Sequence, residues 1–329
     1  MRYLVTGATG FLGGAVTRQL VAAGHQVIAV VRRPEQASEL AALGVTLSQG
    51  DVTDKESMRA PMRGVDGVFH IAGWYKIGVR DTSPGERVNV RGTRNTLELM
   101  RELGIAKGVY TSTLAINSDT HGKVVDERYH YIGPHLSEYD RTKWEAHYNV
   151  AEPMIAAGAP LVIVLPGVIY GPGDTSSIHT TLTQYLQRRL PVVPGGAAYS
   201  WGYIDDIAHA HILAMEQGQV GESYIVAGPP YTLAEALAIA QRYTGIPVPP
   251  QAPPALLRAA ASAVGAMQRV IPVPDQYSAE TLRVAAGVTY LGTSARAQAE
   301  WGYSPRPLEE GLPPTLRYEM RKLGMPTPD

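Results

Sequence analysis

Short apolar runs alternate with stretches of helical periodicity over the first half of the chain. The runs predict strands near residues 2–6, 26–31, 45–49, 66–71, 107–112 and 160–165. Each run lies before or between segments whose apolar residues recur every three to four positions, which indicates helices. Strands that alternate with helices are typical of a parallel, doubly wound sheet. The pattern therefore predicts an α/β fold from residue 1 to about 166.

The second half of the chain follows a different pattern. After Pro166 the periodicity loosens and prolines accumulate, notably at 245–254 and 271–275. A helix and a strand between about 202 and 230 are expected to return to the main sheet. We therefore predict two domains, residues 1–166 plus about 202–230 and a smaller, discontinuous one of about 167–201 plus 231–329. An amphipathic helix from about 254 to 270 either caps a pocket or packs between subunits.

The first predicted strand runs directly into the glycine-rich segment TGATGFLG, which opens a helix. Gly7 permits the tight turn, Gly10 lets the backbone approach a pyrophosphate, and Gly13 allows close packing of helix on strand. The phosphates of a dinucleotide then lie at the amino end of the helix, where unpaired N–H groups point. The segment predicts that the first domain is a Rossmann-type dinucleotide-binding domain. Its expected cofactor contacts are Gly7, Thr9, Gly10, Phe11, Leu12 and Gly13.

The end of the second strand bears on the choice of cofactor. NAD enzymes usually have an acidic residue there, which binds the ribose hydroxyls of the adenosine half. This chain has Val31 followed by Arg32 and Arg33. A guanidinium group can grip a 2'-phosphate with its planar fork. Arg32 therefore favours NADP(H) over NAD(H), unless both arginines are simply solvated at the start of a loop.

Tyr139 and Lys143 stand four residues apart in the run EYDRTKWEAH. On a helix, this spacing places the ammonium group one turn from the phenol. A nearby positive charge favours the phenolate, and so brings a tyrosine that normally titrates near pH ~10 closer to neutrality. The pair predicts a proton donor and acceptor for an oxidoreductase, although the same spacing also occurs by chance on surface helices.

Five motifs occur in order along the chain: TGATGFLG at Thr6, DVTD at Asp51, HIAG at His70, YDRTK at Tyr139 and LPGVIYGPGD at Leu165. With them the chain resembles the extended short-chain dehydrogenase/reductases, of the NAD-dependent epimerase/dehydratase superfamily, over nearly its whole length. The stretches VRRPE, VYTSTLAIN, YIDDIAHAHILA and AEWGYSPRPLEEGL are similar to the branch of dihydroflavonol 4-reductases and 3β-hydroxysteroid dehydrogenases. The resemblance implies an NAD(P)-dependent oxidoreductase that acts on an alcohol or carbonyl group.

The resemblance also implies roles for individual residues. Thr113 takes the place of the family's catalytic serine or threonine, with Ser112 as the alternative. Tyr139 becomes the proton donor and acceptor, and Lys143 lowers its pKa and holds the nicotinamide ribose. Asn89 is the family's central-helix asparagine. Further cofactor contacts are implied for Asp51, Val52, Ala72, Gly73, Pro166 and Val168.

The implied reaction transfers hydride to a carbonyl carbon while Thr113 and Tyr139 hydrogen-bond the carbonyl oxygen. Sugar dehydratases of the superfamily carry an Asp-Glu pair after the catalytic hydroxyl, whereas this chain has Leu114 and Ala115. Sugar epimerases usually offer an arginine to the diphosphate where this chain has aromatic side chains. We therefore expect an uncharged or weakly polar aldehyde, ketone or ring ketone. The aromatic residues expected at its pocket are Tyr199, Trp201 and, unless they are ordinary loop aromatics, Trp74 and Tyr75.

The composition of the 329 residues narrows the function class. The net charge of −1 gives no electrostatic case for a nucleic acid or an anionic membrane. The absence of cysteine excludes disulfides and thiolate nucleophiles, and the histidines show no spacing typical of a metal site. A first strand that starts almost at Met1 leads us to expect no signal peptide and a cytoplasmic protein. Family members commonly dimerise through the helices expected at 85–103 and 138–157, so we expect a homodimer.

Two other functions stay open at this point. A nucleotide-sugar epimerase would use the same tyrosine with tightly bound NAD, and it would show no net reduction of a carbonyl. A non-catalytic NADP sensor would have the same fold, but such proteins typically lack the tyrosine or the lysine. This chain has Tyr139, Lys143 and Thr113, so the sequence favours reduction of a small-molecule carbonyl.

Overall fold

The computed structural model describes residues 1–268 and 270–327. Its largest element is a seven-stranded sheet with the order β10-β6-β5-β4-β1-β2-β3, in which all neighbouring strands are parallel. Its strands are β1 (Arg2–Thr6), β2 (Gln26–Val31), β3 (Thr46–Gln49), β4 (Gly67–His70), β5 (Lys107–Thr111), β6 (Leu161–Pro166) and β10 (Ser223–Val226). The predicted Rossmann-type sheet is confirmed, and each of the six apolar runs of the first half overlaps a strand.

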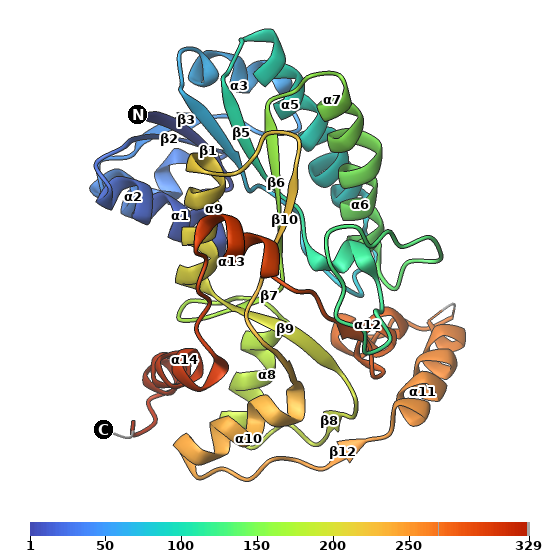
Figure 1. Cartoon of the computed structure of the whole chain (residues 1–329). Coiled ribbons are helices and arrows are strands. Elements are labelled where there is room, and N and C mark those ends of the chain that lie inside the picture. Colours follow the sequence, from blue (N-terminus) through green and yellow to red (C-terminus); the bar gives the residue numbers. More distant parts are fainter. Residues whose placement is uncertain (269, 328–329) are drawn as a thin grey trace.

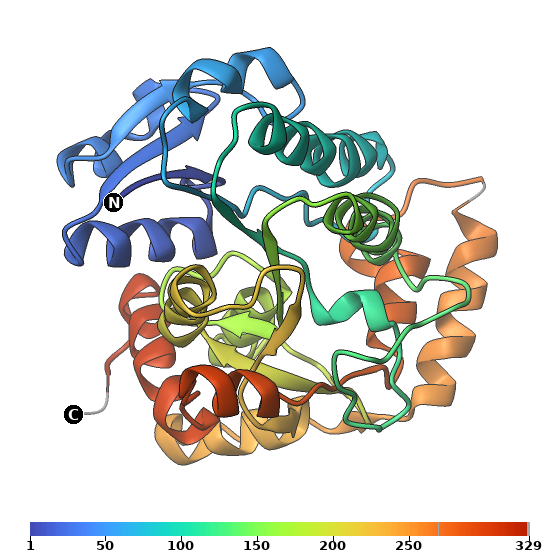
Figure 2. The ribbon, with the colours of Figure 1, turned by 45° about the horizontal axis from the view of Figure 1, so that its top comes forward.

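Helices cover both faces of the large sheet (Figure 1, Figure 2). One face carries α1 (Phe11–Ala22), α2 (Ser38–Ala42) and α9 (Ile204–Glu216). The other carries α3 (Lys55–Met62), α5 (Thr93–Glu102), α6 (Glu138–Ala146) and α7 (Glu152–Ala156). The π-helical turn η2 (Glu86–Gly92) joins α4 (Ser83–Gly85) to α5, and η4 (His147–Ala151) joins α6 to α7. Because both faces are covered, β4 and β6 are buried along their whole length.

A smaller sheet lies beyond the carboxyl end of β6. It has the order β11-β9-β13, and β7 pairs with β9 outside this path. Its strands are β7 (Val168–Tyr170), β9 (Ala198–Tyr203), β11 (Pro230–Thr232) and β13 (Thr289–Tyr290). The short strands β8 (Val193–Pro194) and β12 (Gln251–Ala252) pair separately. The remaining helices include α8 (Ser177–Leu186), α10 (Leu233–Thr244), α13 (Ala295–Trp301) and α14 (Leu308–Lys322).

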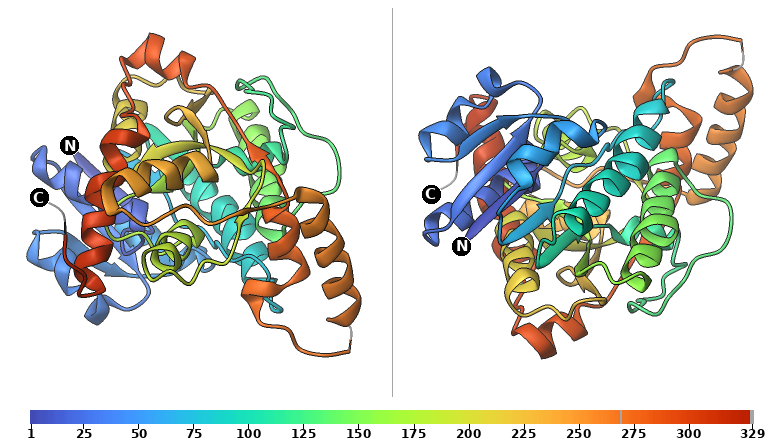
Figure 3. Two further views of the ribbon diagram at one scale, coloured as in Figure 1. Left: turned by 90° about the horizontal axis from the view of Figure 1, so that it is seen from below. Right: turned by 90° about the horizontal axis from the view of Figure 1, so that it is seen from above.

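Two further helices, α11 (Pro254–Met267) and α12 (Ala279–Ala285), form a hairpin. Both views of Figure 3 show this hairpin standing out from the rest of the molecule. The predicted helix of about 254–270 is α11, whose only buried residue among those described is Ala261. Within the chain, α11 packs chiefly against α12.

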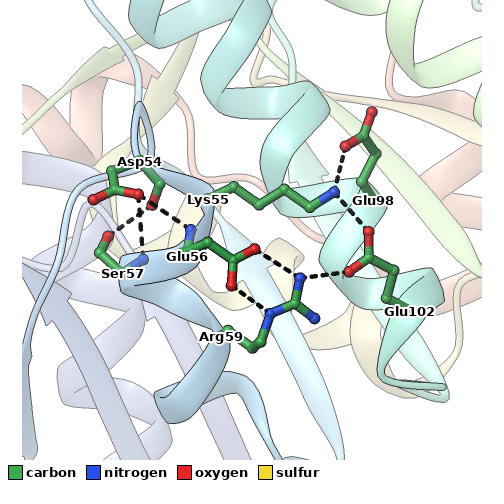
Figure 4. Close-up of polar contacts among 7 residues, drawn as sticks. All are labelled: Asp54, Lys55, Glu56, Ser57, Arg59, Glu98 and Glu102. Carbon is green, nitrogen blue, oxygen red and sulfur yellow. Dashed lines mark hydrogen bonds and ion pairs between the residues drawn. The ribbon is translucent and has the colours of Figure 1, made fainter.

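An ion-pair network joins the outer helices α3 and α5 (Figure 4). Lys55 lies 2.6 Å from both Glu98 and Glu102, and Arg59 reaches Glu56 and Glu102 at 2.7 Å. All five side chains are partly exposed, so each pair contributes at most about 1 kcal/mol. The network therefore aligns two helices and is not part of the candidate site.

Candidate active site

The glycine-rich loop has the geometry of a nucleotide cradle. Gly7 has a φ of +77°, and a Cβ built on it would lie 2.7 Å from the Ala72 nitrogen. A Cβ on Gly13 would lie 2.1 Å from the Gly7 carbonyl oxygen, so neither position accepts a side chain. Gly10 is the N-cap of α1 and supplies no side-chain cap. The first N–H groups of the helix are therefore suited to the oxygens of a pyrophosphate.

The other predicted cofactor residues follow the carboxyl ends of neighbouring parallel strands. Such ends meet at one edge of the sheet. Arg32 is exposed just after β2, and the Asp51 carboxylate after β3 accepts a 2.8 Å bond from the Thr53 N–H. Ala72 N–H donates to the Thr6 hydroxyl at 3.2 Å. The remaining predicted contacts at this edge are Val52, Gly73, Pro166 and Val168, and those in the glycine loop are Thr9, Phe11 and Leu12.

Thr113, rather than Ser112, is the hydroxyl that faces Tyr139. Burial raises the pKa of Tyr139, and a hydrogen bond with the Thr113 side chain opposes that rise. The Thr113 oxygen also accepts from the Ala115 N–H at 3.2 Å. Ser112 is 3% exposed and its hydroxyl lies 2.9 Å from Nδ1 of His147. The structure thus brings Thr113 and Tyr139 together and turns Ser112 toward η4.

Lys143 is anchored beneath this pair by neutral acceptors. It is 4% exposed, and its ammonium group donates to the Thr111 carbonyl at 2.7 Å and to the Tyr110 hydroxyl at 3.1 Å. Burial lowers its pKa to about 7. The sequence predicts that Lys143 lowers the pKa of Tyr139. In the structure the largest influence on this pKa is burial, which raises it, and the opposing influence is the hydrogen bond with Thr113. The protein alone therefore holds Tyr139 as a protonated phenol, the form that can give up a proton.

Asn89 braces the same region. It is 1% exposed, and its side-chain oxygen accepts from the Trp74 N–H at 2.7 Å. Its amide nitrogen donates to the Trp74 carbonyl at 3.0 Å and to the Thr142 hydroxyl at 2.9 Å. One buried amide therefore connects the helix before β5, the segment after β4 and the helix that carries Tyr139.

The four predicted pocket aromatics do not all reach the site. Tyr75 is 42% exposed and meets the ring of Tyr139 edge-on, with 4.7 Å between centroids. Tyr199 stacks on Tyr290 with 6.3 Å between ring centroids. Tyr75 helps to raise the pKa of both tyrosines, so the three phenols lie near one another. Trp201 is 2% exposed and its indole N–H donates to the Tyr231 carbonyl. It lies in the core and presents no face to a ligand.

Trp74 also has a packing role, because its ring lies where a Cβ on Gly85 would touch it at 3.0 Å. The sequence-based prediction missed Tyr110 and Tyr290, both of which contact the predicted catalytic helix. Tyr110 lies in the strand that ends at Thr111, so strand alternation could have placed it under α6. Tyr290 had no such signal, because its position depends on a contact with a residue 150 positions away.

Over residues 1–268 and 270–327, no group of three or more His, Asp or Glu side chains is arranged to hold a metal ion. No helix within the same ranges is long and apolar enough to cross a membrane.

Comparison with known proteins gives a consistent picture. The model of the "NAD dependent epimerase/dehydratase family" matches residues 3–227. Sterol demethylase protein B of Methylococcus capsulatus is 32% identical over 276 residues, 82% of this chain and 83% of that protein. A 2-alkyl-3-oxoalkanoate reductase of Shewanella oneidensis is 33% identical over 278 residues, 79% of this chain and 70% of that protein. The crystal structure of gox2253 has a TM-score of 0.84 and 28% identity, covering 98% of this chain and 99% of its own.

Proposed function

Because the chain belongs to the NAD dependent epimerase/dehydratase family, we propose that it is an NADP(H)-dependent reductase of an apolar carbonyl compound. The observation that carries this proposal is the Thr113–Tyr139 pair, held one helical turn from the buried Lys143. These groups lie at the sheet edge where the glycine loop also ends. The family and the relatives named as reductases support an oxidoreductase of the extended short-chain type.

Thr113, Tyr139 and Lys143 have separate roles in the proposed reaction. When bound, the nicotinamide supplies the hydride. Thr113 and Tyr139 donate hydrogen bonds to the carbonyl oxygen, where negative charge develops. Tyr139 then passes its phenolic proton to that oxygen. Lys143, fixed by Tyr110 and Thr111, supplies positive charge that stabilises the phenolate left behind.

The preference for NADP(H) rests on Arg32. Its exposed guanidinium follows Val31 at the end of β2, beside the glycine loop that follows β1. No carboxylate occupies the position at which NAD enzymes usually bind the adenosine ribose. The remaining loop and sheet-edge residues would hold the shared parts of either dinucleotide.

The character of the substrate rests on the tyrosines around Tyr139. Tyr75 and Tyr199 offer flat, largely apolar surfaces with one polar tip each. Tyr290 is 8% exposed and stacks on Tyr199. Such walls suit ketones on rings or alkyl chains better than charged sugars. The Shewanella relative is named for 2-alkyl-3-oxoalkanoates, in which alkyl chains flank the ketone although the compound also carries a carboxylate. This name supports a ketone on an alkyl chain, and the same aromatic walls would suit a dihydroflavonol or steroid ketone.

The direct test is oxidation of NADPH and of NADH by the purified protein with a panel of aldehydes, aryl ketones, 2-alkyl-3-oxoalkanoates, dihydroflavonols and keto-steroids. We expect carbonyl-dependent oxidation with NADPH preferred, and apolar ketones to be turned over faster than short aldehydes. Tight binding of cofactor without net oxidation would contradict the proposal and favour a nucleotide-sugar epimerase or a sensor.

The proposal includes a homodimer formed through α5 and the α6–α7 helical stretch. Light scattering of the purified protein should then give twice the mass of one chain. A monomer would remove the dimer from the proposal and leave the reductase chemistry untouched, because the catalytic groups all come from one chain.

A further inference from the structure

Both neighbours of Tyr139 in the sequence are held by side chains from residues 231–329. The Glu138 N–H donates to the carboxylate of Glu280 at 2.6 Å. On the other side, the Tyr290 hydroxyl donates to the carboxylate of Asp140 at 3.0 Å. Glu280 lies on α12 and Tyr290 on β13, so two separate elements reach the first turn of α6.

The second carboxylate oxygen of Glu280 binds the segment that follows β4, which also carries Ala72 and Tyr75. It accepts from the Gly78 N–H at 2.7 Å, in the segment that follows Ala72 and Tyr75. Gly78 has a φ of +79°, and a Cβ on it would lie 2.1 Å from the Ser278 hydroxyl. α12 therefore sits directly against this segment, and one carboxylate joins it to the start of α6.

The chemistry of each contact is specific. The Glu138 N–H belongs to the first turn of α6, where a helix leaves N–H groups unpaired and favours negative charge. Ser137 caps the Asp140 N–H at 3.1 Å, so Glu280 serves a different donor of that turn. Asp140 and Tyr290 are 2% and 8% exposed, so their hydrogen bond is shielded from water.

The rest of α6 is anchored differently. Thr142 is tied to Asn89, and Lys143 is tied to β5 through Tyr110 and Thr111. Those partners all belong to the half of the molecule that contains the large sheet. Thr113 lies on the same half, directly after β5. A shift of α12 or β13 would therefore move Tyr139 relative to Thr113.

We propose that Glu280 and Tyr290 are positioning residues, which hold Tyr139 in register with Thr113 only when α12 and β13 are docked against α6. This inference rests on the proposed function, in which Tyr139 gives its proton to the carbonyl. Neither side chain touches the reacting atoms in this role. Each acts through a neighbour of Tyr139. Together they make the distance between Tyr139 and Thr113 depend on where α12 and β13 lie.

The kinetic test uses Glu280→Ala, Glu280→Gln and Tyr290→Phe in the full chain. Each Ala or Phe variant should lower kcat on the order of ten-fold, because small misplacements of a reacting group are costly, while the Kd for NADPH stays within about two-fold. Glu280→Gln should fall between, since one amide oxygen can replace only one carboxylate acceptor. The double variant should lose less than the product of the single losses, because both residues fix one turn.

Matched controls are Glu310→Ala, an exposed glutamate of α14, and Tyr170→Phe, a fully buried tyrosine whose hydroxyl has no hydrogen-bond partner in the described residues. Both should keep the wild-type kcat. A kcat within two-fold of wild type for both Glu280→Ala and Tyr290→Phe would overturn the positioning role.

Hydrogen–deuterium exchange separates this inference from the proposed function. In Glu280→Ala and Tyr290→Phe, amide exchange should accelerate in the first turn of α6, over residues 138–141, and stay unchanged in α7. This result is expected even if the wild-type protein reduces no carbonyl, an outcome that would remove the proposed function alone. Unchanged exchange over 138–141 in both variants would overturn the inference, whatever the activity of the wild type.

Discussion

The ammonium group of Lys143 donates a hydrogen bond of 3.1 Å to the hydroxyl of Tyr110. That hydroxyl is also bonded to Thr93, whose own hydrogen goes to the Asn89 carbonyl, 2.6 Å away. The Thr93 oxygen also lies 3.0 Å from Nε2 of His70. The His70 ring is neutral, because burial lowers its pKa to about 3. These buried contacts run from Lys143 to the Asn89 carbonyl and fix the ammonium group in place.

Replacing Tyr110 with Phe should remove one of the two acceptors of the Lys143 ammonium group. Loss of a hydrogen bond to a charged group disfavours that charge, so the pKa of Lys143 should fall further below its ordinary value. We therefore expect the alkaline fall in kcat to begin about one pH unit lower in the variant than in wild type. Profiles of kcat from pH 6 to 10 for wild type and variant test this, and coincident profiles would show that Tyr110 does not act on Lys143.

Thr113 and Ser112 can be separated by mutation. Thr113→Val should lower kcat by about 10²-fold, because the carbonyl oxygen loses one donor in the transition state. Ser112→Ala should mainly lower the melting temperature, since its hydroxyl pairs with His147 away from Tyr139. Steady-state kinetics and thermal melting of both variants check the assignment. The reverse pattern would give the catalytic role to Ser112.

Arg32→Ala should discriminate between the two dinucleotides. The variant should lose about ten-fold or more in affinity for NADPH, because a charge-assisted contact with the 2'-phosphate is gone, and little affinity for NADH. Titration of both cofactors against wild type and variant measures this. Arg33→Ala is the matched control, and equal losses for NADPH and NADH in Arg32→Ala would mean that Arg32 does not touch the phosphate.

Asp140 should give the protein a measurable pH dependence of stability. Burial raises its pKa from 3.8 to about 7, so the folded state binds a proton that the unfolded state releases between these values. Protonated Asp140 therefore increases the free energy of unfolding at low pH relative to neutral pH, and this contribution is lost as the pH rises toward 7. Asp140→Asn removes this dependence and can still accept from Tyr290.

The melting temperature of Asp140→Asn, relative to wild type, should accordingly rise between about pH 4 and pH 7 and then level off. Glu310→Ala, which changes an exposed carboxylate, should show no such trend. A difference between Asp140→Asn and wild type that stays constant from pH 4 to 8 would mean that Asp140 ionises normally.

The large sheet could be predicted from the sequence because its signals are local. β1, β2 and β5 contain short apolar runs that end just before Gly7, Arg32 and Ser112, and their parallel pairing follows from the helices between them. The residues at their carboxyl ends, such as Gly7 and Thr113, could therefore be placed from the order of the motifs alone.

The contacts that β9, α12 and β13 make around the site could not be predicted in the same way. Trp201 and Tyr199 stand two residues apart and looked equivalent, but Trp201 pairs with Val168 in the middle of the small sheet and is covered. Tyr290 and Glu280 reach α6 across 150 and 142 residues. Such contacts depend on how short strands and helices pack late in the chain, for which periodicity carries no signal.

Isotope transfer tests the proposed reaction most directly. NADPH deuterated at the transferable position of C4 is incubated with the wild-type protein and its best ketone, and the alcohol is examined by mass spectrometry, with Tyr139→Phe in parallel. We predict one deuterium in the new carbon–hydrogen bond, one equivalent of NADP formed, and at least ~10²-fold slower turnover in Tyr139→Phe with cofactor binding retained. An alcohol without deuterium, or full turnover in Tyr139→Phe, would contradict hydride transfer with Tyr139 as the proton donor.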